Sequence, residues 1–202
     1  KKQVETIKNL PSDVWGGIYC GFFYVTDKKV MMVEATKKGD LKKAILNKEV
    51  DIGASSTLLF SIDAIKEIGL FDESFERHQD WEYLIRFFRK YKLFSLRDPL
   101  VKVYGPNMPN GKKAARVKEK YLSEFKKDIY EFGDETAREI IAKHWLEVAA
   151  AFAKEVKVRE CIFYLKKSII YRILPLKEYL NILILINKTL IKKIFFIINA
   201  FY

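Results

Sequence analysis

The sequence predicts an α/β domain with a mixed sheet, followed by an all-α C-terminal extension. Half of the 202 residues are apolar and 14% are aromatic, so a packed core is expected rather than disorder. Up to about residue 104, short β-branched and aromatic runs alternate with amphipathic helical patterns, whereas from Ala114 onward every pattern is helical. We therefore expect one domain over residues 1–113 and a helical extension over residues 114–202.

The first predicted strands flank a polar turn. The stretch "VWGGIYCGFFYVTDKKVMMV", residues 14–33, places aromatic and β-branched residues on both sides of Thr26–Lys29, which is typical of two paired strands. Gly16, Gly17 and Gly21 would let another backbone approach closely. The stretch "LKKAILNK", which starts at Leu41, predicts a short helix.

The next elements come from "DIGASSTLLFS", which predicts an extended segment, and "IDAIKEI", which predicts a helix closed by Gly69. Trp81, Leu84, Ile85 and Phe88 recur at helical spacing and predict a helix whose apolar stripe faces a core. Two strands are then expected, "KLFSL" and "LVKVY", bent at residues 97–99, followed by a loop in "GPNMPNGKK".

The helical extension divides at Gly133 and Pro175. We expect helices over residues 114–130, 134–155 and 158–172, the last two forming an antiparallel pair as in helical-repeat proteins, and a further set after Pro175. In the final segment, lysines and asparagines interrupt the apolar runs, so none reaches the ~20 residues that a membrane span requires. It is either an interfacial amphipathic helix or a helix buried against its neighbours or a partner.

The formal net charge of +11 is unevenly distributed. Residues 1–110 contain 18 Lys and Arg against 15 Asp and Glu, whereas residues 111–202 contain 19 against 11. A basic C-terminal part suggests contact with phosphates of nucleic acid, lipid headgroups or a substrate, or else a lysine-rich solvated surface. Nucleic acid is disfavoured because the basic residues are scattered among acids without a reading motif.

The two cysteines, Cys20 and Cys161, lie far apart among apolar neighbours. We expect buried free thiols, which suit a reducing cytosol, and we expect no secretory signal. The predicted location is therefore cytoplasmic, peripheral at the inner face of a membrane if the C-terminal helices dock there. Because the chain begins with Lys1 rather than methionine, we also expect an upstream segment.

The stretch "GLFDESFERHQDWEYLIRF", residues 69–87, concentrates carboxylates beside a predicted helix start. Asp80 directly precedes the apolar stripe and is either a helix N-cap or a catalytic base. Because the stretch follows a strand–helix unit, it is expected near strand ends, where α/β sheets bind ligands. Ser55 and Ser56 would line the same cleft. A carboxylate held ionised at a helix N-terminus suits a base that takes a proton from a hydroxyl.

Residues 52–104 contain five short motifs in a fixed order. They are Ser55-Ser56, Gly69 with Phe71-Asp72-Glu73, Gln79-Asp80, Trp81 with Arg86, and Pro99-Leu100 with Tyr104. In this order and spacing they resemble the second half of the catalytic domain in family-two inverting glycosyltransferases of the GT-A fold, and the resemblance extends over about residues 14–113. The resemblance implies an incomplete GT-A sheet.

The resemblance also implies roles for these residues. Asp80 matches the general base that deprotonates the acceptor hydroxyl, and His78 and Gln79 would orient the acceptor or the diphosphate. Asp72 and Glu73 match the turn that shapes the acceptor side, whereas Trp81 and Arg86 are expected to be structural, Trp81 in the core. Lys112 and Lys113 either contact phosphates or belong to a solvated loop.

The chain departs from the family in one large respect. Nothing in residues 1–50 matches the nucleotide-binding half, and no D-x-D sequence occurs. The intact enzyme would use a nucleotide-sugar donor, Mg²⁺ or Mn²⁺, and a glycan or lipid-linked acceptor at the cytosolic face of a membrane. This chain alone is expected to be inactive without its missing half. The alternative is a non-catalytic interaction module that retains a fold remnant and binds a partner protein through its helices.

Overall fold

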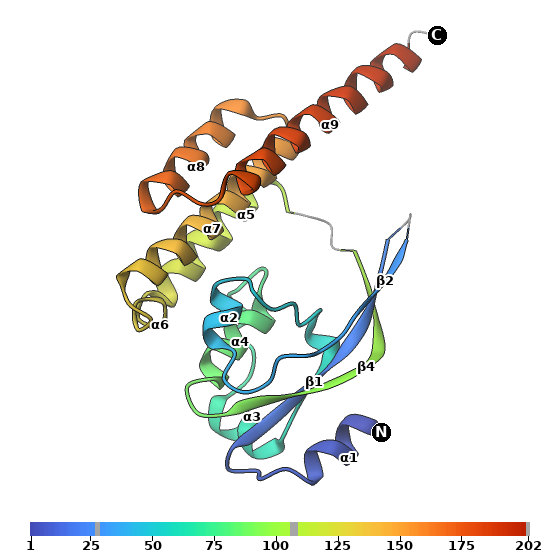
Figure 1. Cartoon of the computed structure of the whole chain (residues 1–202), viewed down its shortest axis with the longest axis vertical. Helices are drawn as coiled ribbons and strands as arrows, with labels where there is room; N and C mark the ends of the chain where they lie inside the picture. The colour runs from blue at the N-terminus through green and yellow to red at the C-terminus, as the bar shows by residue number, and fades with distance from the viewer. Residues whose placement is uncertain (27–28, 106–108, 201–202) are drawn as a thin grey trace. The chain divides into compact units, whose positions relative to one another are not determined.

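The computed structural model describes residues 1–26, 29–105 and 109–200, with the side chains of Lys188 and residues 190–200 excepted. The chain divides into two compact units, Lys1–Asn107 and Met108–Tyr202 (Figure 1). The first contains the described strands, and the second is helical. The predicted combination of a mixed α/β part and a helical C-terminal part is therefore confirmed, with the division falling within the predicted loop rather than after it.

The sheet of the first unit is built around one long strand, β1 (Trp15–Val25). It pairs antiparallel with β2 (Val30–Val33) and β3 (Leu58–Phe60), and parallel with β4 (Lys92–Tyr104). The β1–β2 hairpin matches the prediction from the aromatic and β-branched runs on either side of the polar turn.

Strand β4 corrects one sequence prediction, because the two strands expected around residues 97–99 form a single strand. Its pairing with β1 shifts register on both sides of Gly21. A Cβ atom on Gly21 would lie only 2.4 Å from the carbonyl oxygen of Arg97 and 2.8 Å from that of Val33. β4 runs parallel beside β1 and carries extra residues opposite Gly21, and the missing side chain of Gly21 makes room for the β4 backbone.

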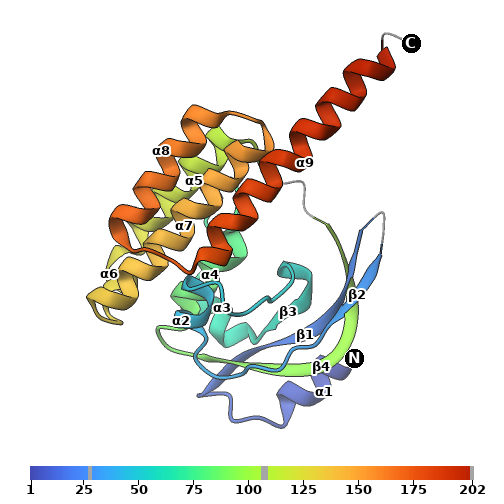
Figure 2. The same ribbon diagram turned by 45° about the horizontal axis from the view of Figure 1, so that its top comes forward.

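Four α-helices accompany the sheet: α1 (Lys2–Lys8), α2 (Lys42–Leu46), α3 (Ile62–Ile68) and α4 (Gln79–Phe87). The sheet lies between α1 on one side and α2, α3 and α4 on the other (Figure 2). The rings of Tyr83 and Phe87 lie 4.8 and 5.1 Å from the ring of Phe60 on β3, so the buried face of α4 is held on the sheet by aromatic packing.

The second unit consists of α5 (Gly111–Glu124), α6 (Lys126–Tyr130), α7 (Asp134–Lys154), α8 (Val158–Tyr171) and α9 (Leu176–Ala200). The first of these begins at Gly111, within the predicted loop, and the predicted helix over residues 114–130 is interrupted at Phe125. The other helix ends agree with the predictions to within one residue.

Helices α7 and α8 form the predicted antiparallel pair, and α5 and α9 also pack against α7 (Figure 2). Glu135, at the start of α7, pairs with Arg172 beyond the end of α8 at 3.0 Å. The Ser168 hydroxyl donates to the Ala142 carbonyl across the helix contact at 2.8 Å. Small residues on α7, among them the buried Ala142 and Ala149, allow this close approach.

Cys20 and Cys161 are both buried free thiols, as predicted. Among the helices that the structure describes, none is long and apolar enough to cross a bilayer.

Candidate functional site

The acidic turn after α3 is fastened to α4 by Arg86. Its guanidinium donates to both carboxylate oxygens of Glu82, through Nε at 2.5 Å and Nη2 at 2.9 Å. The same group donates to the carbonyls of Ile68 at 2.6 Å and Leu70 at 2.8 Å, on either side of Gly69, whose φ of 88° closes α3. Arg86 is therefore structural, as predicted.

Asp72 shapes the next part of the turn. Its Oδ1 accepts the backbone N–H of Ser74 at 2.8 Å and the Ser74 hydroxyl, an arrangement in which an aspartate replaces a backbone turn acceptor. The hydrogen bond to Glu82 is the main cause that raises the pKa of Arg86, and the negative charge of Asp72 also raises it. Glu73 is exposed. Asp72 thus positions the loop through its own carboxylate, while Glu73 faces solvent.

Helix α4 begins at Gln79, and its N-cap residue is His78 rather than Asp80. His78 is the N-cap residue and has left-handed backbone angles, φ 65° and ψ 29°. Its ring stacks on Trp81 with 4.5 Å between centroids and 22° between planes. Trp81 is half-buried, so its expected place in the core is wrong. The buried residues of α4 all follow Trp81 in the chain. They are Glu82, Tyr83, Leu84, Ile85 and Phe87.

Asp80 lies in the first turn of α4, one position after the exposed Gln79. The N-cap interpretation of Asp80 is therefore wrong. Its Oδ1 accepts the backbone N–H of Trp81 at 3.0 Å. Burial raises the pKa of Asp80, and this outweighs the hydrogen bonds from the backbone N–H groups of Trp81 and Asp80 and the positive charge of Arg77, which lower it. A half-buried carboxylate with a raised pKa is a stronger base than an exposed one.

The predicted serines lie elsewhere in the same unit. Ser55 and Ser56 form, with Thr57, a 3-10 turn directly before β3, and both serines are exposed. The turn is held by the buried Thr57, whose hydroxyl lies 2.5 Å from the carbonyl of Ile52 and 2.8 Å from that of Ala54. The two serine hydroxyls are thus presented to solvent by a fixed backbone.

Lys112 and Lys113 belong to the second unit and lie in the first turn of α5, not in a loop. Asn110 caps this helix by accepting the backbone N–H of Lys113 at 2.8 Å. The Glu155 carboxylate accepts the N–H of Gly111 at 2.5 Å. Lys157 is the main cause that lowers the pKa of Glu155, and Lys112 contributes through its charge. Lys112 is exposed and Lys113 is half-buried.

The residues that the fold brings together are those of the turn and the start of α4. Sequence reasoning missed Glu82, whose side chain is only 4% exposed and which anchors Arg86. The signal was present: a carboxylate four residues before an arginine is a common ion-pair spacing on a helix. Its burial, however, depends on the packing of α4 and was not readable from that spacing.

Among the described residues, no three or more His, Cys, Asp and Glu side chains gather in a way that would hold a metal ion. Comparisons of the chain with protein-family models, curated proteins and solved structures gave no match.

Proposed function

We propose that this chain is the acceptor-side half of an inverting glycosyltransferase and that Asp80 is its general base. The observation that carries the proposal is the environment of Asp80: a half-buried carboxylate in the first turn of α4, with its pKa raised by burial. A general base is most effective when its pKa approaches the working pH.

The chemistry assigned to Asp80 is a single displacement. As the acceptor oxygen attacks the anomeric carbon of a nucleotide-sugar, the carboxylate takes the hydroxyl proton. A new carbon–oxygen bond forms on one face while the bond to the nucleoside diphosphate breaks on the other, and the diphosphate leaves with the electron pair. The configuration at the anomeric carbon is thereby inverted. Base catalysis of this kind contributes about 10²–10⁴-fold to the rate.

The neighbours of Asp80 are suited to positioning the acceptor. Stacking on Trp81 restrains the His78 ring, Gln79 is exposed beside the base, and Arg86 and Asp72 hold the preceding turn. In the proposal, His78 and Gln79 contact the acceptor or the diphosphate, and Ser55 and Ser56 offer hydroxyls from the turn before β3.

The donor side is assigned to residues beyond this half. The edge strand β2 supports this division, because its Val30 and Met32 side chains are 61% and 58% exposed. Apolar side chains on an edge strand are a place where further strands of a larger sheet would add.

The second candidate is a non-catalytic module that binds a partner through its helices. The observation in its favour is the number of apolar side chains that α8 and α9 leave exposed, Ile170 and Leu176 among them. Such a module would need no base at Asp80, so substitution of that residue separates the two functions.

The test compares Asp80→Asn with Asp63→Asn in the protein produced from its complete reading frame. Asp63 is a matched control, because it occupies the same second helical position in α3 but is exposed. With a panel of nucleotide-sugars, release of nucleoside diphosphate should fall about 10²–10⁴-fold in Asp80→Asn and stay near wild type in Asp63→Asn. Equal turnover in both variants refutes the role of Asp80. A wild-type protein that turns over none of the donors favours the interaction module.

A further inference from the structure

Helices α8 and α9 and the segment between them each expose large apolar side chains. On α8 these are Ile162, Phe163, Ile169 and Ile170, and the series continues through Ile173 and Leu176 into α9. Ile170 and Ile173 are 80% and 77% exposed. Leu180 and Leu183 follow on α9 at helical spacing and are also exposed. We call this series the α8–α9 surface.

This surface is not the face by which α8 packs into its unit. That face carries Cys161 and Ser168, which are buried, and Tyr164, whose ring lies 5.4 Å from that of Phe152 on α7. The helix is therefore apolar on two sides, and the fold uses only one. Exposed apolar series of this size mark sites of interaction with a partner or a membrane.

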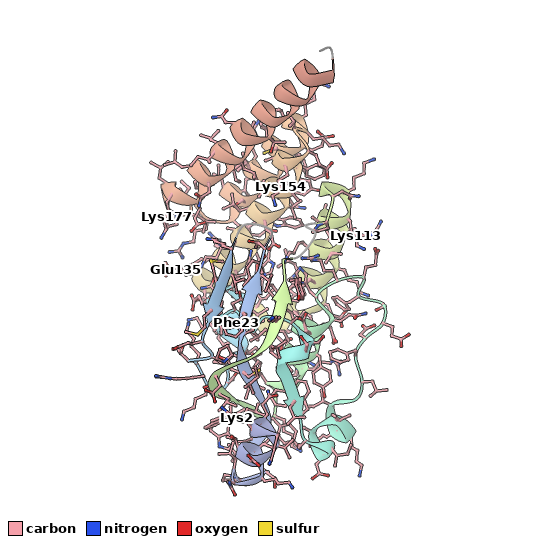
Figure 3. The ribbon with its side chains drawn as sticks, turned by 90° about the vertical axis from the view of Figure 1, so that its right-hand side faces the viewer. Lys2, Phe23, Lys113, Glu135, Lys154 and Lys177 are labelled. Carbon is pink, nitrogen blue, oxygen red and sulfur yellow. The ribbon has the colours of Figure 1, made fainter. Side chains whose placement is uncertain are left out.

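Positive charge is concentrated in the same two helices. Residues 156–202 contain nine Lys and Arg against two Asp and Glu, a net of +7, whereas residues 111–155 contain ten against nine, a net of +1. Lys166 is exposed one turn after Ile162, within the apolar series. Lys177 directly follows Leu176 and is exposed at the start of α9 (Figure 3).

We propose that the α8–α9 surface binds an anionic lipid bilayer, lying in its interface without crossing it. Apolar side chains would enter the acyl boundary while the lysines contact lipid phosphates, the pattern of interfacial amphipathic helices. A second copy of this chain fits less well, because pairing two such surfaces would bring two strongly positive regions together. The inference goes beyond the transferase proposal and does not depend on it, since vesicle binding requires no catalysis.

The test is flotation of the full chain with vesicles. Wild type should bind vesicles of phosphatidylcholine and phosphatidylserine in about a 3:1 ratio, bind pure phosphatidylcholine much more weakly, and be released by about 1 M salt. Lys166→Gln with Lys177→Gln should lower partitioning about thirtyfold, because each lysine near an anionic surface contributes about fivefold. Ile170→Ser with Ile173→Ser should lower binding to both vesicle types.

Matched controls lie in the first unit. Ile62→Ser removes an apolar side chain of α3 that is 63% exposed, and Lys66→Gln removes one exposed charge from the same helix. Both should bind like wild type. Circular dichroism checks that every variant is folded. We expect all of them to fold, because the changed side chains are exposed.

Two results would overturn the proposal. The first is a folded wild-type chain that binds neither vesicle type. The second is binding that the lysine and isoleucine variants leave unchanged. If wild type instead ignores vesicles and forms a dimer that Ile170→Ser with Ile173→Ser dissociates, the surface belongs to a second copy of the chain.

Discussion

Replacing Arg86 with alanine should destabilise the first unit severely. The substitution removes two bonds to the Glu82 carboxylate and two to the carbonyls of Ile68 and Leu70. It also leaves a carboxylate whose side chain is only 4% exposed without its cation. Breaking a buried ion pair in this way costs about 3–5 kcal/mol. For a unit of this size the lower figure corresponds to a fall in melting temperature of about 12 °C or more.

The measurement is urea unfolding followed by tryptophan fluorescence in a Trp145→Phe background. Trp145 is the tryptophan of the second unit, so Trp15 and Trp81 then report on the first unit alone. A double-mutant cycle with Glu82→Gln isolates the pairwise term, because the double variant no longer buries an unpaired charge. We expect a coupling energy of about 2 kcal/mol or more between residues 82 and 86.

An exposed ion pair in the same unit provides the control. Lys90 pairs with Glu67, and their side chains are 54% and 39% exposed. Lys90→Ala should therefore shift the unfolding midpoint far less than Arg86→Ala, because solvent screens the exposed pair. If the two variants lose similar stability, or if the coupling between residues 82 and 86 is below about 0.5 kcal/mol, Arg86 does not fasten the turn as described.

Three further outcomes are expected. Burial raises the pKa of Asp80 in the folded chain, so its ionised form costs stability at neutral pH, and this cost is lost as the pH falls through the folded pKa. Asp80→Asn should therefore raise the melting temperature at pH 7 and lose this advantage below about pH 4; a lower melting temperature at pH 7 contradicts it. Gly21→Ala should cost about 3 kcal/mol, measured by urea unfolding, because its Cβ would meet the Arg97 carbonyl; a near-neutral effect would mean that the β4 backbone does not come this close to residue 21. Ser168→Ala should cost about 1 kcal/mol of the second unit's stability, because a buried hydrogen bond to Ala142 is lost, and thermal unfolding of Ser168→Ala that matches wild type would contradict the α7–α8 contact.

Local sequence patterns predicted most of the secondary structure. The alternation of aromatic and β-branched residues around the polar turn predicted the β1–β2 hairpin. Gly69 predicted the end of α3, and the apolar residues of "AREIIAKHWLEVAAAFAKE" and "RECIFYLKKSIIYRI" predicted the α7–α8 pair. These features depend on residues only a few positions apart in the chain, so the sequence pattern alone can predict them.

The tertiary structure decided what depends on residues far apart in the chain. The pairing of β4 with β1 needs a glycine at position 21, where the Arg97 carbonyl comes close, and the local pattern of "KLFSLRDPLVKVY" indicated only a bend. The start of α4 depends on the left-handed backbone of His78, and no capping pattern in the sequence predicted this.

The candidate site shows the same division. The sequence by itself determined which carboxylates, serines and lysines are present and that Asp80 stands near a helix start. Only the folded chain decided that Asp80 is half-buried with a raised pKa, that Trp81 stacks on His78 outside the core, and that Glu82 is the buried partner of Arg86. The physical reason is that the local hydrogen-bonding preference of a residue depends on the residue and its neighbours in the chain. The burial of a side chain and the electrostatic field at it depend on every element packed around it.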